Sequence, residues 1–382
     1  MPVSLTSQQE RDFLNRGFSR RSFGRLAALL SAGATLPFAN EFALAQMARI
    51  EGGIPAGAIK LNANENPLGP CREALEALFA AAREGGRYFF EEEDVFRRAM
   101  ADSEGLRPNY VIAYAGSGLA LHTSVIAFTS PQRSLVVGNP TYEVAGHVAR
   151  FVGSTVHEIP LTKDYAHDVR AMVKADPNAG LYYICSPNNP TGSLTPRADI
   201  EWLLANKPAG SVLLLDEAYL HFSNGTPCPD LVAADKDLII LRTFSKLYGM
   251  AGLRAGAALG RPDLLERLHQ WSGGALPSTG MVAATASLKV RNLVPERRKI
   301  NAENRAATFE FLDKHNFKYI PSTSNCFMLD VGRPGREAIR AMQSENIYLG
   351  RVWPVMPNHV RVTVGTREEM AKFQAALQKV MA

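Results

Sequence analysis

The sequence is poor in the residues that bind metals or cross-link chains. Its 382 residues include four cysteines and eight histidines. No cysteines form a C-x-x-C pair and no histidines form an H-x-x-x-H pair, so we expect no metal site. Cys71, Cys185, Cys228 and Cys326 are expected to be buried or unreactive thiols, although an oxidising destination leaves a disulfide open.

Long apolar runs and clustered positive charge are also absent. The formal net charge is +5, but the basic residues are scattered and the longest basic run is RRK at 297–299. Because no aromatic residues interleave with them, we expect solvated surfaces and no nucleic-acid interface. No stretch is long and apolar enough to act as a stable membrane anchor.

The N-terminus carries the pattern of an export signal. SRRSF at 19–23 precedes an apolar stretch from Leu26 to Phe38, and Ala43-Leu44-Ala45 offers a small-x-small cleavage site. These features resemble a twin-arginine signal peptide. The alternative is an amphipathic surface helix with an unrelated arginine pair. We therefore expect residues 1–45 to lie outside the fold and the protein to reach the periplasm through the twin-arginine machinery, with cleavage after Ala45 left open.

Short apolar runs alternate with helical segments in the middle of the chain. The runs are VIAY at 111–114, SLVV at 134–137, STVHEI at 154–159, LYYIC at 181–185, SVLLL at 211–215, LIIL at 238–241 and AGAAL at 255–259. Strands of this kind are buried on both faces, as in a mostly parallel sheet covered by helices. The sequence therefore predicts an α/β fold.

The pattern also predicts how the chain divides into domains. An arm and a helix are expected at residues 46–84, because LNANENPLGP at 61–70 is too irregular for a helix. The large domain is expected at 85–278. A mixed pattern of helices and short strands then predicts a smaller α/β domain at 279–382.

One stretch combines a strand end with hydroxyls, a lysine and an arginine. In RTFSKLYGMAGLRAG at 242–256, Thr243, Ser245 and Lys246 follow an apolar run, at the edge where open α/β sheets bind ligands. Arg254 adds a permanent cation. A surface lysine followed by a glycine-rich turn is one interpretation. The other is an imine between Lys246 and an aldehyde cofactor whose phosphate is held by the hydroxyls and Arg254.

Polar residues follow two other apolar runs. Gly116, Ser117 and Gly118 open a helix, and the backbone N–H groups of a helix N-terminus can receive a phosphate. A plain turn is the alternative. Tyr142 follows the next run and is placed to stack on a flat ring, although a tyrosine taken alone is more often a packing residue.

Two further strand ends carry an amide and a carboxylate. Asn189 lies in SPNNPTG at 186–192, a shaped loop because its prolines and asparagines suit neither strand nor helix, and it could donate to a ring oxygen. Asp216 follows a buried run, where desolvation would protonate it unless a cation lay nearby. A pyridinium nitrogen is such a cation, and a helix-capping aspartate is the alternative.

Taken together, these motifs resemble the fold type I pyridoxal phosphate aminotransferases, most closely the histidinol-phosphate aminotransferase family. The matching motifs are LNANENPLGP, SPNNPTG, DEAY, RTFSK, GMAGLRAG and RVTVGT, which extend from residue 61 to 366. The resemblance implies the aspartate aminotransferase-like fold with pyridoxal 5′-phosphate as cofactor, and it implies a homodimer.

The resemblance also assigns roles to residues of this chain. Lys246 is similar to the Schiff-base lysine, Asp216 to the partner of the pyridine nitrogen, and Asn189 and Tyr219 to the partners of the ring hydroxyl. By the same resemblance, Ser117, Ser245 and Arg254 contact the cofactor phosphate, and Tyr142 stacks on the cofactor ring. Arg361 is similar to the arginine that pairs with the substrate α-carboxylate, and Tyr88 to the tyrosine that reaches the neighbouring subunit's site.

The implied reaction moves an amino group between an L-amino acid and a 2-oxo acid such as 2-oxoglutarate. The chain departs from the family pattern in FFEEE at 89–93, and the residues around Arg351, which some relatives use for a substrate phosphate, are unusual. With the export signal, these departures predict a substrate other than histidinol phosphate. A decarboxylase of amino-acid phosphates and a non-catalytic ligand-binding protein are the competing hypotheses.

Overall fold

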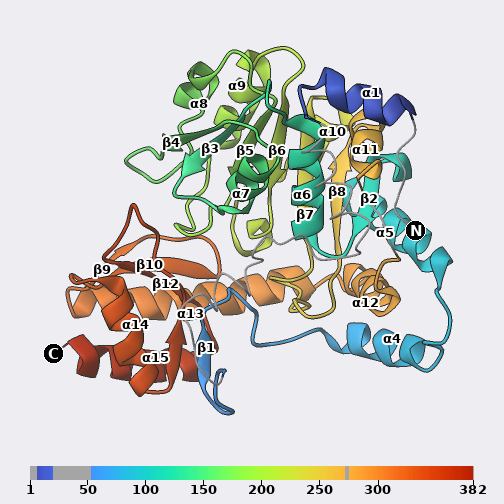
Figure 1. Cartoon of the computed structure of the whole chain (residues 1–382). Helices are drawn as coiled ribbons and strands as arrows, with labels where there is room; N and C mark the ends of the chain where they lie inside the picture. The colour runs from blue at the N-terminus through green and yellow to red at the C-terminus, as the bar shows by residue number, and fades with distance from the viewer. Residues whose placement is uncertain (1–6, 20–52, 272–274, 382) are drawn as a thin grey trace.

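A seven-stranded sheet forms the centre of the larger part of the molecule in the computed structural model, which describes residues 7–19, 53–271 and 275–381 (Figure 1). Its strand order is β2-β8-β7-β6-β5-β3-β4. Every neighbouring pair is parallel except those of β8, which runs antiparallel to β2 and β7. The predicted α/β fold with a mostly parallel sheet is confirmed. The strands are β2 Val111–Tyr114, β3 Leu135–Asn139, β4 Val156–Pro160, β5 Leu181–Cys185, β6 Val212–Asp216, β7 Leu238–Thr243 and β8 Gly256–Gly260.

Alternate side chains of the central strands enter two cores, one on each face of the sheet. In β6, Leu213 and Leu215 belong to one buried cluster and Leu214 belongs to the other. This follows from the two-residue period of a strand, and it explains why these runs are apolar at every position.

Helices cover both faces of this sheet (Figure 1). One face carries α1 Ser7–Asn15, α6 Ser117–Phe128, α7 Val144–Phe151 and α11 Pro262–His269. The other carries α4 Arg72–Ala82, α5 Phe90–Glu104, α8 Val169–Ala175, α9 Arg197–Asn206, α10 Pro229–Ala233 and α12 Ser278–Leu288. None of the helices in the described residues is long and apolar enough to cross a membrane.

A second, smaller unit contains an antiparallel sheet in the order β12-β10-β9. Its core is a separate apolar cluster built by the helices that pack on these strands. The elements of this unit are α13 Leu293–Lys314, β9 Lys318–Ile320, β10 Cys326–Asp330, α14 Gly335–Ser344, β11 Ile347–Leu349, β12 His359–Thr363 and α15 Arg367–Met381. The larger part also contains two short 3-10 helices, η1 Pro108–Tyr110 and η2 Leu220–Phe222.

The structure modifies the predicted domain limits at two places. In the arm expected at 46–84, β1 Ile59–Leu61 pairs with β11 and so completes the small unit. Helix α12 lies almost wholly beyond the expected boundary at 278, yet Met281 and Ala283 belong to a core of the large sheet. The pairing of β1 with β11 and the packing of α12 on the large sheet join residues far apart in the sequence. Such contacts leave no local pattern, so the sequence could not predict either of them.

Residues 11–19 form part of the folded body, contrary to the expectation that residues 1–45 lie outside it. Phe13 and Phe18 are 2% and 3% exposed and join the core of the large sheet. The Arg16 guanidinium donates to the carbonyls of Ile126, Ala127 and Thr129 at the end of α6. These are the carbonyls that a helix leaves without intrahelical partners. The arginine pair and the cleavage site lie outside the described residues.

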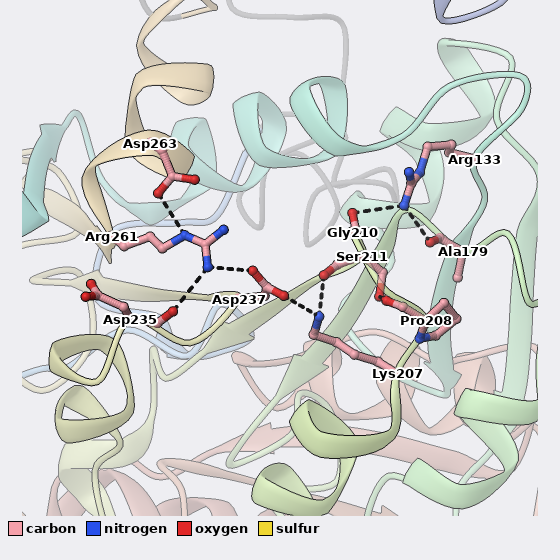
Figure 2. Close-up of polar contacts among 10 residues, drawn as sticks. All are labelled: Arg133, Ala179, Lys207, Pro208, Gly210, Ser211, Asp235, Asp237, Arg261 and Asp263. Carbon is pink, nitrogen blue, oxygen red and sulfur yellow. Dashed lines mark hydrogen bonds and ion pairs between the residues drawn. The ribbon is translucent and has the colours of Figure 1, made fainter.

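The amino ends of the parallel strands are joined by polar contacts (Figure 2). Asp237, just before β7, accepts from Lys207 Nζ at 2.9 Å and pairs with Arg261 Nη1 at 2.7 Å. Arg133 donates to the carbonyls of Ala179 and Gly210 at 3.2 and 2.9 Å. This edge is thus occupied by structural contacts, and the predicted ligand residues lie at the opposite, carboxyl edge.

Candidate active site

Asp216 and Thr243 are the last residues of the neighbouring parallel strands β6 and β7. The ladder pairs Asp216 with Leu241 and, on the other side, with Cys185 at the end of β5. Three strand ends therefore meet at the carboxyl edge of the sheet, where the sequence places polar residues.

Asp216 lies in an environment that disfavours its charge. It is 4% exposed. Burial raises the pKa of its carboxyl to about 6, although hydrogen bonds from Tyr183 Oη at 3.0 Å and from the Ala218 backbone N–H at 3.1 Å oppose that shift. A cation at this position would restore the ionised form. The predicted need of Asp216 for a positive partner thus has a physical basis.

Arg254, Ser245 and Thr243 form a connected polar group beside the start of α6. Arg254 Nη1 donates to Ser245 Oγ at 3.1 Å, and Thr243 Oγ1 lies 3.0 Å from the same oxygen. Arg254 Nη2 donates to the Ala115 carbonyl at 3.1 Å, two residues before Ser117 begins the helix. Cations, hydroxyls and a helix N-terminus together suit a phosphate.

Glycine is required at position 116 of this group. Gly116 has φ +81°, and a Cβ there would lie 2.3 Å from Arg254 Nη2. At Gly118 a Cβ would meet nothing within 4 Å, so the space beside the first turn of α6 is open. Burial lowers the pKa of the Arg254 guanidinium, and an anion beside it would offset that burial.

Lys246 follows β7 and lies over the ring of Tyr219, with Nζ 5.7 Å from the ring centroid. Its Nζ donates to the Ala63 carbonyl at 3.1 Å. Asn64, the next residue of the arm, donates from Nδ2 to Tyr219 Oη at 3.1 Å. The structure thus brings Lys246 and Tyr219 together and adds the N-terminal arm to the site.

Arg361 on β12 connects the small unit to the SPNNPTG loop. It is fully buried and donates from Nη1 to Asn189 Oδ1 at 2.9 Å and from Nη2 to the Asn62 carbonyl at 2.6 Å. The first contact uses the side-chain oxygen of Asn189, which leaves its side-chain amide nitrogen as the atom that could donate to a ring oxygen. Asn189 and Arg361 are therefore direct neighbours.

The remaining predicted residues are placed differently. Tyr142 is half-buried and packs against the core of the large sheet. Tyr88 is 73% exposed and stacks on Phe90 with ring centroids 5.3 Å apart, so it lies on the surface of the single chain. Arg351 forms a two-pronged ion pair with Glu143, with N–O distances of 2.6 and 2.7 Å.

Four residues that contribute to this region were not predicted from the sequence. Asn64 contacts Tyr219, and Tyr183 contacts Asp216. Glu143 pairs with Arg351, and the ring of Trp353 lies under Arg351. Asn64 stands in the LNANENPLGP motif and Glu143 directly follows Tyr142, so both could have been found by extending those motifs. Tyr183 and Trp353 carry no local signal.

The four cysteines are free thiols in the structure. In the part of the chain that is described, no three His, Cys, Asp or Glu side chains gather as metal ligands would.

Comparison with known proteins decides the family. The family model of aminotransferase class I and II matches residues 56–377. The chain belongs to this aminotransferase family. This transaminase is 32% identical to histidinol-phosphate aminotransferase 1 of Nitrosococcus oceani over 331 residues, which cover 85% of this chain and 89% of that protein. It is 30% identical to the histidinol-phosphate aminotransferase of Moorella thermoacetica over 338 residues, which cover 85% and 86%.

Solved structures agree with this assignment. The transaminase superimposes on histidinol-phosphate aminotransferase from Sinorhizobium meliloti in complex with pyridoxal-5′-phosphate with a TM-score of 0.80, at 26% identity, over 91% of this chain and 95% of that one. Aspartate aminotransferase from Thermus thermophilus with maleate, at 20% identity and a TM-score of 0.76, shares the fold over 89% and 95%. The predicted family, fold and cofactor are confirmed.

The residues present fit pyridoxal 5′-phosphate. Asp216 suits a protonated ring nitrogen because burial has raised its pKa. The group of Arg254, Ser245 and the start of α6 suits the phosphate, and Gly116 leaves that position clear of a side chain. Lys246 directly follows Ser245 and supplies the amine that an aldehyde needs.

Proposed function

We propose that this transaminase moves an amino group between an L-amino acid and a 2-oxo acid such as 2-oxoglutarate, and that its amino donor is not histidinol phosphate. The observation that supports the transamination is that the arm residues Asn62, Ala63 and Asn64 contact Arg361, Lys246 and Tyr219, respectively. An amine and a guanidinium are thus connected through one short segment, and the buried Asp216 carboxylate ends strand β6.

Each of these residues has a distinct task in the proposed reaction. Bound pyridoxal phosphate supplies an electron-withdrawing ring that acidifies the α-proton of the amino acid. Asp216 keeps the ring nitrogen protonated, because its own ionisation is favoured only beside a cation. Lys246 Nζ takes the α-proton and returns it as a general acid–base. Arg361 binds the α-carboxylate through its planar guanidinium.

The buried position of Arg361 supports its task. Asn189 and the Asn62 carbonyl hold the guanidinium in a fixed orientation. A pre-oriented cation in a water-poor site binds a carboxylate more strongly than an exposed cation would.

The sequence at 89–93 supports a substrate other than histidinol phosphate. Phe89 has φ +52° and precedes α5, whose first turn contains Glu91, Glu92 and Glu93. In the family that the chain resembles this segment borders the site, so its departure from the family pattern is what supports a different substrate.

A homodimer is the second part of the proposal. Exposed apolar side chains occur in the arm, on α4 and α5 and in the segment between these helices, and exposed apolar surface is typical of interaction sites. They are Leu68, Leu75, Phe79, Tyr88, Phe90 and Val95, between 37% and 73% exposed. A second copy would cover them and would allow Tyr88 to approach its partner's site.

Export through the twin-arginine pathway to the periplasm is the third part. It rests on the order of SRRSF at 19–23, the apolar stretch and the ALA sequence at 43–45. Replacing Arg20 and Arg21 by lysine should retain the protein in the cytoplasm, as measured by cell fractionation. Unchanged periplasmic recovery of the double variant would contradict the export proposal.

The donor can be identified directly. The purified protein is incubated with a panel of amino acids and 2-oxoglutarate, and the oxo acids are measured by mass spectrometry. A new oxo acid with glutamate formed in equal amount supports transamination. Release of carbon dioxide without an oxo acid would overturn it in favour of the decarboxylase hypothesis.

A further inference from the structure

Glu143 and Arg351 form an ion pair between the two parts of the molecule. Glu143 immediately precedes α7 in the large part, and Arg351 follows β11 in the small unit. Both N–O contacts are short, at 2.6 and 2.7 Å, and the side chains are 28% and 13% exposed. A two-pronged pair in this partly buried setting is stronger than a surface ion pair.

This ion pair lies beside the arginine proposed to bind the substrate carboxylate. Arg351 and Arg361 are joined through their backbones, since Arg361 N–H donates to the Arg351 carbonyl at 3.3 Å. Both guanidinium groups lie near the ring of Trp353, at 4.1 and 5.6 Å from its centroid. Trp353 is 1% exposed and is fixed by a hydrogen bond from its indole N–H to the Thr141 carbonyl at 3.2 Å.

The two arginines differ in what they can offer a substrate. Arg361 donates to neutral oxygens, Asn189 Oδ1 and the Asn62 carbonyl. Arg351 already faces a carboxylate with both of its terminal nitrogens. A phosphate dianion arriving at Arg351 would have to displace Glu143 or lie beside it, and like charges at such distances repel.

We propose that Glu143 determines specificity by occupying Arg351, so that the site disfavours amino donors whose side chain bears a phosphate ester. This inference rests on the proposed transamination. It assigns to the donor a side chain without a phosphate, because the Glu143 carboxylate already faces both terminal nitrogens of Arg351. Glu143 acts as a positioning residue on Arg351 and takes no part in proton transfer.

The test compares two donors that differ only in the phosphate. Holoenzyme is mixed with histidinol or histidinol phosphate, and the half-reaction is followed through the visible spectrum of the bound cofactor, which requires no acceptor. Wild type is compared with Glu143→Gln, which keeps the shape but removes the charge. Glu345→Gln is the matched control, because it removes an ion pair with Lys379 whose partners are 27% and 70% exposed.

The expected result is a change in the ratio of the two rates. In wild type, histidinol reacts at least as efficiently as histidinol phosphate. Glu143→Gln shifts the ratio of the second-order rate constants of the half-reaction toward the phosphate by about tenfold or more, since it removes one full charge next to the dianion. Glu345→Gln leaves the ratio unchanged. A wild-type preference of a hundredfold for histidinol phosphate, or a Glu143→Gln ratio within twofold of wild type, would overturn the inference.

A binding measurement separates this inference from the proposed reaction. Calorimetric titration of the holoenzyme with phenyl phosphate should give a dissociation constant about tenfold lower for Glu143→Gln than for wild type. If phosphate binding responds in this way while no amino donor reacts, Glu143 controls phosphate binding at Arg351 but the proposed transamination fails. If donors react but phenyl phosphate binds both proteins equally, the inference fails alone.

Discussion

Tyr183 donates a hydrogen bond to the Asp216 carboxylate across two neighbouring parallel strands, at an oxygen–oxygen distance of 3.0 Å. The bond favours the ionised form of Asp216, whereas burial favours the protonated form and prevails, so the pKa is about 6. A cation beside the Asp216 carboxyl group would therefore lower its pKa and favour its ionised form.

Cofactor affinity should depend on pH through Asp216. Without cofactor, the Asp216 carboxyl is protonated below its pKa of about 6. Because a protonated ring nitrogen pairs with the ionised form, the affinity of the cofactor-free protein for pyridoxal phosphate should rise between about pH 5 and 7. Fluorescence titration at each pH measures the dissociation constant of pyridoxal phosphate. Asp216→Asn should bind weakly at every pH and lose this rise; an equal rise in the variant would refute the assignment.

The same group should affect the stability of the cofactor-free protein in the opposite direction. Its folded-state pKa of about 6 exceeds the ordinary value of 3.8, so the folded chain binds more protons in that interval. The contribution of Asp216 to the free energy of unfolding should therefore fall as pH rises from about 4 to 6. Urea denaturation of wild type and Asp216→Asn, compared across this pH interval, isolates the contribution of Asp216 to the free energy of unfolding. A contribution that grows with pH would contradict the raised pKa.

Replacing Gly116 by alanine should weaken cofactor binding without unfolding the protein. The new Cβ would lie 2.3 Å from Arg254 Nη2 and would push the guanidinium away from Ser245. We expect the dissociation constant of pyridoxal phosphate to rise by about tenfold or more, the effect of losing one charge-assisted hydrogen bond. Gly252→Ala is the control, since its Cβ would meet nothing within 4 Å. Equal affinity in the two variants would show that Arg254 does not hold the phosphate.

Arg242 should be essential for stability. It is 2% exposed and forms ion pairs with Glu104 and Glu217, the residue after Asp216. Arg242→Met leaves the buried Glu217 carboxylate and the partly buried Glu104 carboxylate without their cation and should lower the free energy of unfolding by about 3–5 kcal/mol. Arg98→Met, at an ion pair whose arginine is 67% exposed, should cost about 1 kcal/mol or less. Chemical denaturation that gave equal losses would contradict this difference.

The N-terminal segment should also stabilise the fold. Phe13 is 2% exposed, whereas its neighbour Leu14 is 41% exposed. Phe13→Ala should therefore lower the free energy of unfolding by about 3 kcal/mol, and Leu14→Ala by about 0.5 kcal/mol or less. Thermal unfolding of the full chain would decide. If Phe13→Ala has no effect, residues 11–19 do not pack on the body in solution, and their removal with a signal peptide would cost nothing.

Local patterns predicted the sheet and the positions of the residues at its carboxyl edge. Asp216 and Lys246 follow apolar runs, and a strand of known direction places its end at a known edge. The sequence did not predict that Asn64 contacts both Tyr219 and Thr363, because these contacts join residues 155 and 299 positions apart. The same is true of Glu143 and Arg351, which are 208 positions apart.

The N-terminal expectation differed from the structure for a related reason. SRRSF at 19–23 is recognised by its composition, which says nothing about whether the residues before it pack on the body. Phe13 and Phe18 join a core cluster that contains residues of α6 and borders Trp271, far along the chain, with the Phe13 and Trp271 rings 5.7 Å apart.

The central claim is that Lys246 is the amine through which this chain handles its cofactor and the α-proton. Lys246→Ala, reconstituted with pyridoxal phosphate, should lose the visible absorbance of the lysine-bound cofactor and should slow transamination by at least about a thousandfold, while the exposed-lysine control Lys236→Ala behaves as wild type. A Lys246→Ala protein that keeps both the absorbance and the rate would contradict the account.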